Sequence, residues 1–152
     1  GATVEGEIGH VGDATVGDNV VTDNYTTPEE ALDFIEKTGV DALAVAIGTA
    51  HGAYKEKPCL DLERLRQIRE KVNTPLVLHG GSGLSDDDFR NTIRDGIAKI
   101  NIFTDLCVAG VEGVKEGLEK ELSYLEMRNL KVEKIKEAVK AKIRLFGSEN
   151  KA

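Results

Sequence analysis

Hydrophobic residues along this chain occur in short runs, and these runs alternate with longer stretches in which apolar residues recur at helical spacing. Four runs have the length and composition of strands, namely residues 3–9, 42–47, 75–78 and 97–102. The first run alternates, so that Glu5 and Glu7 share one face while Val4, Gly6 and Ile8 share the other. The run at 42–47 is apolar throughout, which predicts a strand buried on both faces.

Helix boundary signals lie between these runs, and the first pair is the clearest. Thr27, Pro28 and Glu30 have the spacing of a capping box with proline at the first helical position. Gly39 supplies the left-handed residue that commonly ends a helix. A helix is therefore predicted from Pro28 to Thr38.

The remaining stretches predict further helices and one long loop. Asp61 begins a second helix and Ser85 a third. Two longer helical stretches follow, around 106–122 and 131–146. Residues 10–27 are rich in glycine and aspartate with little periodicity, which predicts a long loop of the kind that is usually functional or disordered.

The order of these elements predicts an α/β fold with a parallel sheet. Four strands alternate with helices in units of about 30 residues, and right-handed crossovers connect such units. A complete (β/α)8 barrel needs eight units and about 250 residues. We therefore expect residues 1–152 to form one partial-barrel domain, either half of a TIM barrel or a four-stranded open sheet.

Composition narrows the class of function. The formal net charge of -7 argues against nucleic-acid binding, because no basic patch balances the acidic residues. No apolar run approaches the roughly 20 residues of a membrane span, and no signal-peptide pattern opens the sequence. Cys59 and Cys107 lack a CxxC spacing, which suggests a reducing compartment, and we expect a cytoplasmic protein.

Two histidines follow consecutive buried strands and lie next to glycines. His51 stands in GTAHG and His79 in LHGGSG, and the carboxyl ends of barrel strands are where α/β barrels build their active sites. The pair predicts a shared metal site, although either ring could instead be a satisfied core residue. Catalytic zinc usually has three protein ligands, and His10 in the long loop is a candidate for the third.

Carboxylates and a glycine-rich turn supply further candidate chemistry. Glu5 and Glu7 could serve a metal or belong to a solvated strand end, and Glu7 is the better metal candidate because it lies nearer the carboxyl end of the strand. The turn at 80–83, including Gly80, Gly81 and Ser82, could hold an anion with its backbone N–H groups. The segment 101–104 offers a second set of polar groups where barrels frequently bind phosphate, although both segments could be ordinary turns.

Four segments of this sequence resemble the class II ketose-bisphosphate aldolases. They are VEGEIG at 4–9, AVAIGTAHGAY at 44–54, PLVLHGGSG at 75–83 and KINI at 99–102, and they occur in the order found in that family. Members are zinc-dependent TIM barrels that cleave fructose or tagatose 1,6-bisphosphate into dihydroxyacetone phosphate and a triose phosphate. The resemblance covers essentially the whole chain and implies the C-terminal half of such a barrel.

The resemblance implies roles for individual residues. His51 and His79 match two of the three catalytic zinc ligands, and Glu7 matches a strand carboxylate that holds zinc in a resting position. Zinc would act as a Lewis acid on the ketone. The residues that match family positions binding the dihydroxyacetone phosphate moiety are Gly52, Lys55, Gly80, Ser82, Asn101 and Thr104.

Three departures from the family pattern limit what this chain supplies. The catalytic Asp-His pair of the family lies earlier in the barrel and has no counterpart here, so the isolated chain is expected to lack it. The loop after the first strand lacks the Gly-Gly-x-Glu-Asp segment of the family, and Asp13 or Asp18 could substitute for its proton-transfer residue. Phe103 stands where fructose-specific members tend to carry Asp and tagatose-type members Ala, so the resemblance leaves the substrate open.

The expected partners follow from these observations. They are a phosphorylated sugar, the N-terminal half of the barrel and further copies of the same protein, because half a barrel exposes sheet edges and an apolar face. The alternative is a catalytically incomplete half barrel that binds phosphate and zinc or serves only as an assembly unit.

Overall fold

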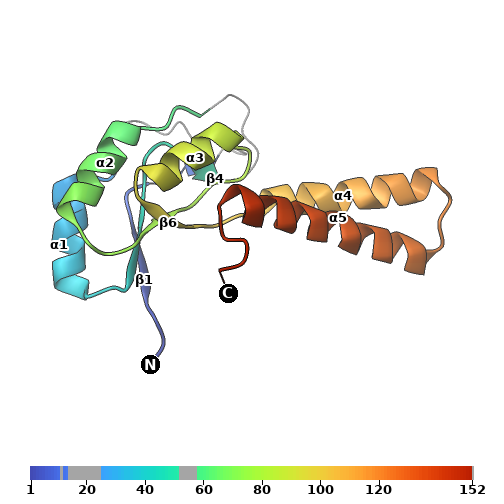
Figure 1. Cartoon of the computed structure of the whole chain (residues 1–152), viewed down its shortest axis with the longest axis horizontal. Coiled ribbons are helices and arrows are strands. Elements are labelled where there is room, and N and C mark those ends of the chain that lie inside the picture. The colour runs from blue at the N-terminus through green and yellow to red at the C-terminus, as the bar shows by residue number, and fades with distance from the viewer. Residues whose placement is uncertain (11, 14–24, 52–57, 152) are drawn as a thin grey trace. The chain divides into compact units, whose positions relative to one another are not determined.

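The chain forms two compact units, residues 1–102 and residues 103–152, which we call the sheet unit and the hairpin unit (Figure 1). The structure is a computed structural model that describes residues 1–10, 12–13, 25–51 and 58–151, with residues 12, 13 and 51 described by their backbone.

The sheet unit contains four parallel strands that alternate with helices. The sheet has the order β1-β3-β5-β6, the same as the order of these strands along the chain. Helices α1, α2 and α3 connect successive strands (Figure 1). This is the architecture of half a TIM barrel, as the sequence predicts. The bounds are β1 Glu5–Ile8, α1 Pro28–Thr38, β3 Ala42–Val45, α2 Leu62–Lys71, β5 Leu76–Leu78, α3 Asp86–Arg94 and β6 Ile97–Ile100.

The predicted helix boundaries are confirmed at the level of hydrogen bonds. The Thr27 side chain accepts from the Glu30 N–H, and the Glu30 carboxylate accepts from the Thr27 N–H in return. Gly39 ends α1 in the left-handed conformation at φ 66°. Ser85 and Asp88 make the same reciprocal pair at the start of α3.

Strand register places the polar strand residues on one face of the sheet. Glu7 pairs with Ala44, Ala44 with Val77, and Val77 with Lys99. Residues paired in register project to the same side of a sheet. The opposite face of β1 lies against α1, because a Cβ added at Gly6 would be 2.6 Å from the Phe34 ring. The alternation predicted for the first strand is therefore confirmed.

The core of the sheet unit lies between this second face and the helices. β3 and the two residues that follow it, Ala46 and Ile47, are buried apart from partial exposure of Ala42, as the apolar composition of 42–47 predicts. Leucine and isoleucine from α2 and a phenylalanine from α3 complete the packing. The largest fully buried apolar side chains are Leu43, Val45, Ile47, Leu65, Ile68, Leu76, Val77, Leu78 and Phe89.

Two short strands add to the four that the sequence predicts. β2 (Gly12–Asp13) and β4 (Ala50–His51) form a separate two-stranded parallel sheet. The loop predicted over 10–27 therefore contains a two-residue strand at 12–13, which lies outside the four-stranded parallel sheet that the sequence predicts. Two-residue strands depend on backbone hydrogen bonds alone and are too short to produce a side-chain periodicity.

The hairpin unit consists of α4 (Thr104–Glu119) and α5 (Tyr124–Leu145). Gly110, Gly113 and Gly117 are the buried residues of α4, and each faces α5 side chains or backbone. α5 begins at Tyr124 rather than near residue 131, because Ser123 and Glu126 form a capping box that the predicted boundary overlooked. No helix in the described parts of the chain combines the length and the apolar composition needed to cross a membrane.

Candidate active site

His79 follows β5 directly and lies between two carboxylates from β1. Its Nδ1 is 2.9 Å from Glu7 Oε1, and its Nε2 is 3.1 Å from Glu5 Oε1. β1 and β5 are not neighbours, because β3 runs between them. The glutamate side chains therefore reach across β3, where register sets Ala42 opposite Glu5 and Ala44 opposite Glu7.

Lys99 on β6 extends this cluster toward the other edge of the sheet. Its ammonium group donates to Glu5 Oε2 and to Asn101 Oδ1, each at 2.8 Å. Lys99 and Asn101 are two residues apart along the chain, and strand alternation directs such pairs to one face. The polar face of the sheet thus carries a chain of contacts from Glu7 through His79, Glu5 and Lys99 to Asn101.

The charge on Glu5 is stabilised by its partners. The hydrogen bond from Lys99 is the largest influence, and it lowers the pKa of Glu5 below its ordinary value. Partial burial acts in the opposite direction, and the contact with His79 lowers the pKa further. Glu5 is therefore a carboxylate throughout the neutral range, with one oxygen on each partner.

The two histidine-bearing segments lie against each other. Gly80 has φ 65°, and a Cβ added there would lie 2.5 Å from the Ala50 carbonyl oxygen. Only glycine allows this backbone approach at a positive φ. Since Ala50 precedes His51, the turn after His79 touches the strand that ends at His51. The His51 side chain lies outside the described parts of the structure, so a metal site shared by the two rings stays a prediction.

The other predicted catalytic and phosphate-binding residues are distributed as follows. Asp13 pairs in register with His51 across the small sheet, which brings one of the two proton-transfer candidates beside the second histidine segment. Gly81 packs beside Ile100, and Ser82 is buried. Thr104 is the first residue of α4 in the hairpin unit. Asp18, Gly52 and Lys55 lie outside the described residues.

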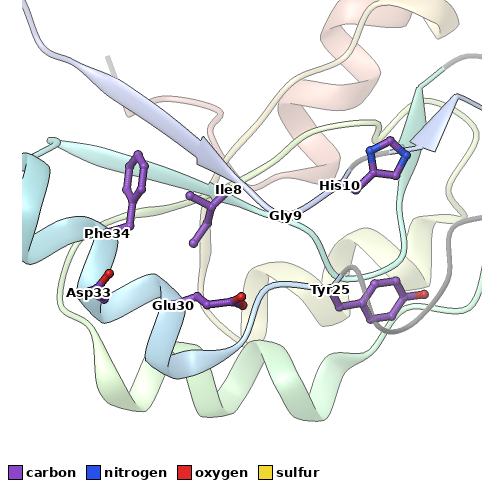
Figure 2. A pocket seen from close by; sticks show the side chains of 7 residues that line it. All are labelled: Ile8, Gly9, His10, Tyr25, Glu30, Asp33 and Phe34. Carbon is purple, nitrogen blue, oxygen red and sulfur yellow. The ribbon is translucent and has the colours of Figure 1, made fainter.

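His10, the candidate for a third ligand, lines a separate pocket. This pocket has a volume of about 510 Å³ and is bounded by the end of β1, by Tyr25 and by the α1 residues Glu30, Asp33 and Phe34 (Figure 2). Ile8, which projects to the helix side of the sheet, also lines it. His79 and Glu7 belong to the opposite, polar face. The structure therefore associates His10 with the α1 side of β1 rather than with the carboxylate cluster.

The donor types on the polar face suit zinc. Imidazole nitrogen and carboxylate oxygen are both zinc ligands, and His79 and Glu7 offer one of each within 2.9 Å. Within the described residues, no group of three histidine, cysteine or acidic side chains has the arrangement of a metal site. Any further ligand must come from residues beyond those, of which His51 is the predicted one.

Comparison with known protein families decides whether the four-stranded sheet is half of a TIM barrel or an open sheet. The model of the class II fructose-bisphosphate aldolases matches residues 1–151. The chain belongs to this family. The half barrel is accordingly the C-terminal half of an aldolase barrel, and the family membership that the sequence resemblance implies is confirmed.

Related aldolases agree over nearly the whole chain. It is 44% identical to the sulfofructosephosphate aldolase of Alkalicoccus urumqiensis over 97% of its length, and 40% identical to the fructose-bisphosphate aldolase of Staphylococcus epidermidis over 100%. The crystal structure of the YdjI aldolase from Escherichia coli K12 superposes with a TM-score of 0.84 and 43% identity over 99% of the chain. These matches cover 53%, 54% and 51% of the relatives, so the chain spans about half the length of the aldolases it matches.

Sequence reasoning assigned no role to Lys99 and favoured Glu7 over Glu5. The sequence feature that could have placed Lys99 and Glu5 in the site is the alternation of side chains along a strand. Glu5 shares a face with Glu7, and Lys99 shares a face with Asn101. The contact that joins Glu5 to Lys99 crosses two intervening strands, which a single sequence does not order in space.

Proposed function

We propose that this chain supplies the C-terminal half of the active site of a zinc-dependent class II aldolase, which reversibly cleaves a ketose 1,6-bisphosphate to dihydroxyacetone phosphate and a triose phosphate. The observation that carries the proposal is His79 held between Glu7 and Glu5 at the carboxyl end of the sheet. This is the edge at which TIM barrels place their catalytic groups. We take residues 1–152 as one partial-barrel domain within that enzyme.

His79, His51 and Glu7 are the residues of this chain that would hold zinc. When bound, zinc supplies a Lewis acid that polarises the substrate ketone and stabilises the negative charge that develops as the carbon–carbon bond breaks. The polar face of the sheet orients His79 for this role through contacts with Glu5 and Glu7. Ala44 and Val77 beneath this cluster are buried, which excludes water from below.

The phosphate of the dihydroxyacetone phosphate moiety is assigned to the turn after His79 and the segment after β6. Gly80 and Gly81 would offer backbone N–H groups that no side chain of their own covers, and Ser82 adds a hydroxyl. Asn101 and Thr104 follow β6. Gly52 and Lys55 complete the proposed set by resemblance to the family.

Proton transfer needs acid–base residues, and this chain supplies only some of those that the family uses. Asp13, which pairs in register with His51, and Asp18 are the two candidates in this chain. The Asp-His pair expected earlier in the barrel would come from the N-terminal half. We therefore expect residues 1–152 expressed alone to show little or no cleavage, since one lost acid–base group costs about 10²–10⁴ in rate.

Membership of the aldolase family favours the enzyme over a half barrel that only binds phosphate and zinc. We further propose a homo-oligomer in the cytoplasm. Support for association comes from the hairpin unit, whose exposed apolar side chains include Phe103, Val111 and Leu118.

The proposed function is tested on the assembled enzyme, in which residues 1–152 are combined with the N-terminal half of the barrel. Fructose 1,6-bisphosphate, tagatose 1,6-bisphosphate and sulfofructosephosphate are offered in parallel, the last because one relative is named for it. Consumption of one of them should require zinc, disappear with chelator, and be lost in His79→Ala. Lys37→Met on the exposed side of α1 is the matched control and should keep its activity. Zinc-independent cleavage, or full activity in His79→Ala, would contradict the proposal.

A separate measurement tests the phosphate assignment. Ser82→Ala should weaken dihydroxyacetone phosphate binding by about 0.5–3 kcal/mol, the range for neutral to charge-assisted hydrogen bonds. Calorimetry that gives the same affinity for both proteins would remove Ser82 from the site.

A further inference from the structure

We propose that the ion pair between Glu5 and Lys99 is a positioning unit, which holds the His79 ring through Nε2 and so leaves Nδ1, beside Glu7, for a metal ion. The inference rests on the proposed function, because it takes His79 and Glu7 as metal ligands. It adds two residues to which no role has been given, and it assigns different roles to the two carboxylates of β1.

The two carboxylates differ in how firmly they are held. Both oxygens of Glu5 are engaged, Oε1 by His79 and Oε2 by Lys99, and its side chain is 28% exposed. Glu7 contacts His79 through one oxygen and is 44% exposed. Among the described residues, Glu7 has no cation corresponding to Lys99. Among the described residues, Glu5 is therefore held through both of its oxygens, whereas Glu7 is held through one.

The sheet itself explains why Glu5 reaches His79. Neighbouring strands lie about 4.8 Å apart, so β1 and β5 are separated by about 10 Å across β3. The β3 residues in register with Glu5 and Glu7 are both alanines, whose methyl groups leave this space to longer side chains. Lys99 spans the corresponding distance from the other side. The positioning unit is thus a bridge over the sheet that depends on small residues in β3.

The chemistry of imidazole determines which ring nitrogen of His79 would bind the metal ion. A neutral ring has one N–H and one lone pair, and an ionised carboxylate accepts from N–H only. Both nitrogens face a carboxylate here, but only Glu5 is anchored by Lys99, so a metal ion would replace the Glu7 contact at Nδ1 and leave the N–H on Nε2 with Glu5. Metal-binding histidines generally donate their other N–H to a carboxylate in this way, which fixes the tautomer and the ring orientation. Glu5 fits that role, and Lys99 holds Glu5 in place.

The test uses the assembled enzyme, with both halves of the barrel, stripped of metal, and zinc alone as the probe. Zinc affinity is measured by competition with a chelator for the unmodified protein, Glu5→Gln and Lys99→Met. Lys71→Met is the matched control, because it breaks an ion pair with Glu29 on the outer helices without touching the polar face. The ring nitrogens of ¹⁵N-labelled histidine are observed by NMR with and without zinc, and His79 is assigned by its loss in His79→Gln.

We expect zinc at Nδ1 of His79 with the proton retained on Nε2. Glu5→Gln should weaken zinc about 10–100-fold, the range for residues that orient metal ligands. Lys99→Met should weaken it by a smaller factor, because Glu5 is still present but no longer anchored, and Lys71→Met should leave the affinity unchanged. Circular dichroism identifies any variant that fails to fold. In that case the histidine ¹⁵N spectrum of the unmodified protein still shows which nitrogen of His79 binds zinc.

Two results would overturn this inference while leaving the proposed function intact: zinc bound through Nε2 of His79, or unaltered zinc affinity in folded Glu5→Gln and Lys99→Met. Absence of zinc binding by the unmodified protein would overturn the proposed function itself, and the positioning role with it.

Discussion

The sheet unit and the hairpin unit hold themselves together in different ways. All the large apolar side chains that are buried among the described residues belong to the sheet unit. In α4 the buried residues are three glycines, and α5 has none. Most of the exposed large apolar side chains lie in the hairpin unit. The sheet unit is therefore stabilised by a conventional core, and the hairpin unit by close contact between two helix backbones.

This difference shows where each unit depends on its surroundings. Glycine at the contact lets α4 and α5 approach closely. Surface ion pairs of Glu116 with Lys120 and Lys134 further stabilise the hairpin unit. Neither the glycine contact nor the ion pairs bury much apolar surface, and burial of apolar surface is the main source of stability. The hairpin unit thus carries apolar surface that its own fold leaves uncovered, including a groove of about 510 Å³ lined by Phe103, Leu106, Val111, Val114 and Ile135.

The largest expected effect is the loss of a core aromatic from the sheet unit. Phe89 is fully buried, so Phe89→Ala should lower the free energy of unfolding by about 3–5 kcal/mol through lost transfer energy and a residual cavity. Urea denaturation measures it. Phe103, which is 77% exposed in the hairpin unit, is the matched control, and Phe103→Ala should change stability by less than about 0.5 kcal/mol.

Equal losses in the two phenylalanine variants would break the comparison, because they would mean that Phe103 is covered in the assembled protein. A loss in Phe103→Ala that grows with protein concentration would identify a second copy as the cover and support the proposed homo-oligomer.

A smaller effect is expected from glycines in α4. A Cβ at Gly113 would lie 2.7 Å from the Lys131 Cα, a backbone atom that moves only if the helices separate. Gly113→Ala should therefore destabilise by about 1–3 kcal/mol, as overpacking does. At Gly110 the nearest atom is the flexible end of Ile135 at 3.3 Å.

Gly110→Ala is accordingly the matched control and should be neutral or stabilising by up to about 1 kcal/mol, since alanine has the higher helix propensity. Thermal unfolding of both variants gives the comparison. If Gly113→Ala is as stable as Gly110→Ala, the helices are not held by backbone contact.

The smallest effect concerns pH. Hydrogen bonds from Lys120 and Lys134 lower the pKa of Glu116 from 4.5 to about 2. Because the folded pKa lies below the unfolded one, the contribution of Glu116 is fully present above about pH 4.5 and is lost as pH falls through about 2. The difference in melting temperature between the unmodified protein and Glu116→Gln should shrink over this range.

Val108→Thr, an uncharged change at an exposed position on the same helix, is the control and should show no such pH-dependent difference. A difference for Glu116→Gln that stays constant from pH 5 to about pH 2 would show that the ion pairs do not form in solution.

The fold was predictable wherever local chemistry decides the structure. Capping residues placed α1 and α3, and the apolar run at 42–47 placed the central strand. The start of α5 was missed, although Ser123 and Glu126 have the spacing of a capping box. The small sheet at 12–13 and 50–51 was missed because its pairing joins residues distant in sequence through backbone atoms.

The candidate site shows the same limit more strongly. His79 and Glu7 could be named from strand-end position and alternation, and the structure brings them together. The positioning of His79 by Glu5 and Lys99 could not, because it depends on three strands lying in a particular order. His10 was a reasonable third ligand by proximity in sequence, yet its pocket opens on the helix side of β1.

The order β1-β3-β5-β6 also bears on how the chain folds during synthesis. No strand is inserted between two earlier ones, so each new strand joins the edge left by its predecessor after one intervening helix. Chains emerge from the ribosome N-terminus first, at about 5–20 residues per second. On that timescale the sheet can grow unit by unit, each strand covering the edge most prone to pairing with a foreign chain. The sheet edge that is open to pairing therefore advances from β1 to β6 as these residues are made.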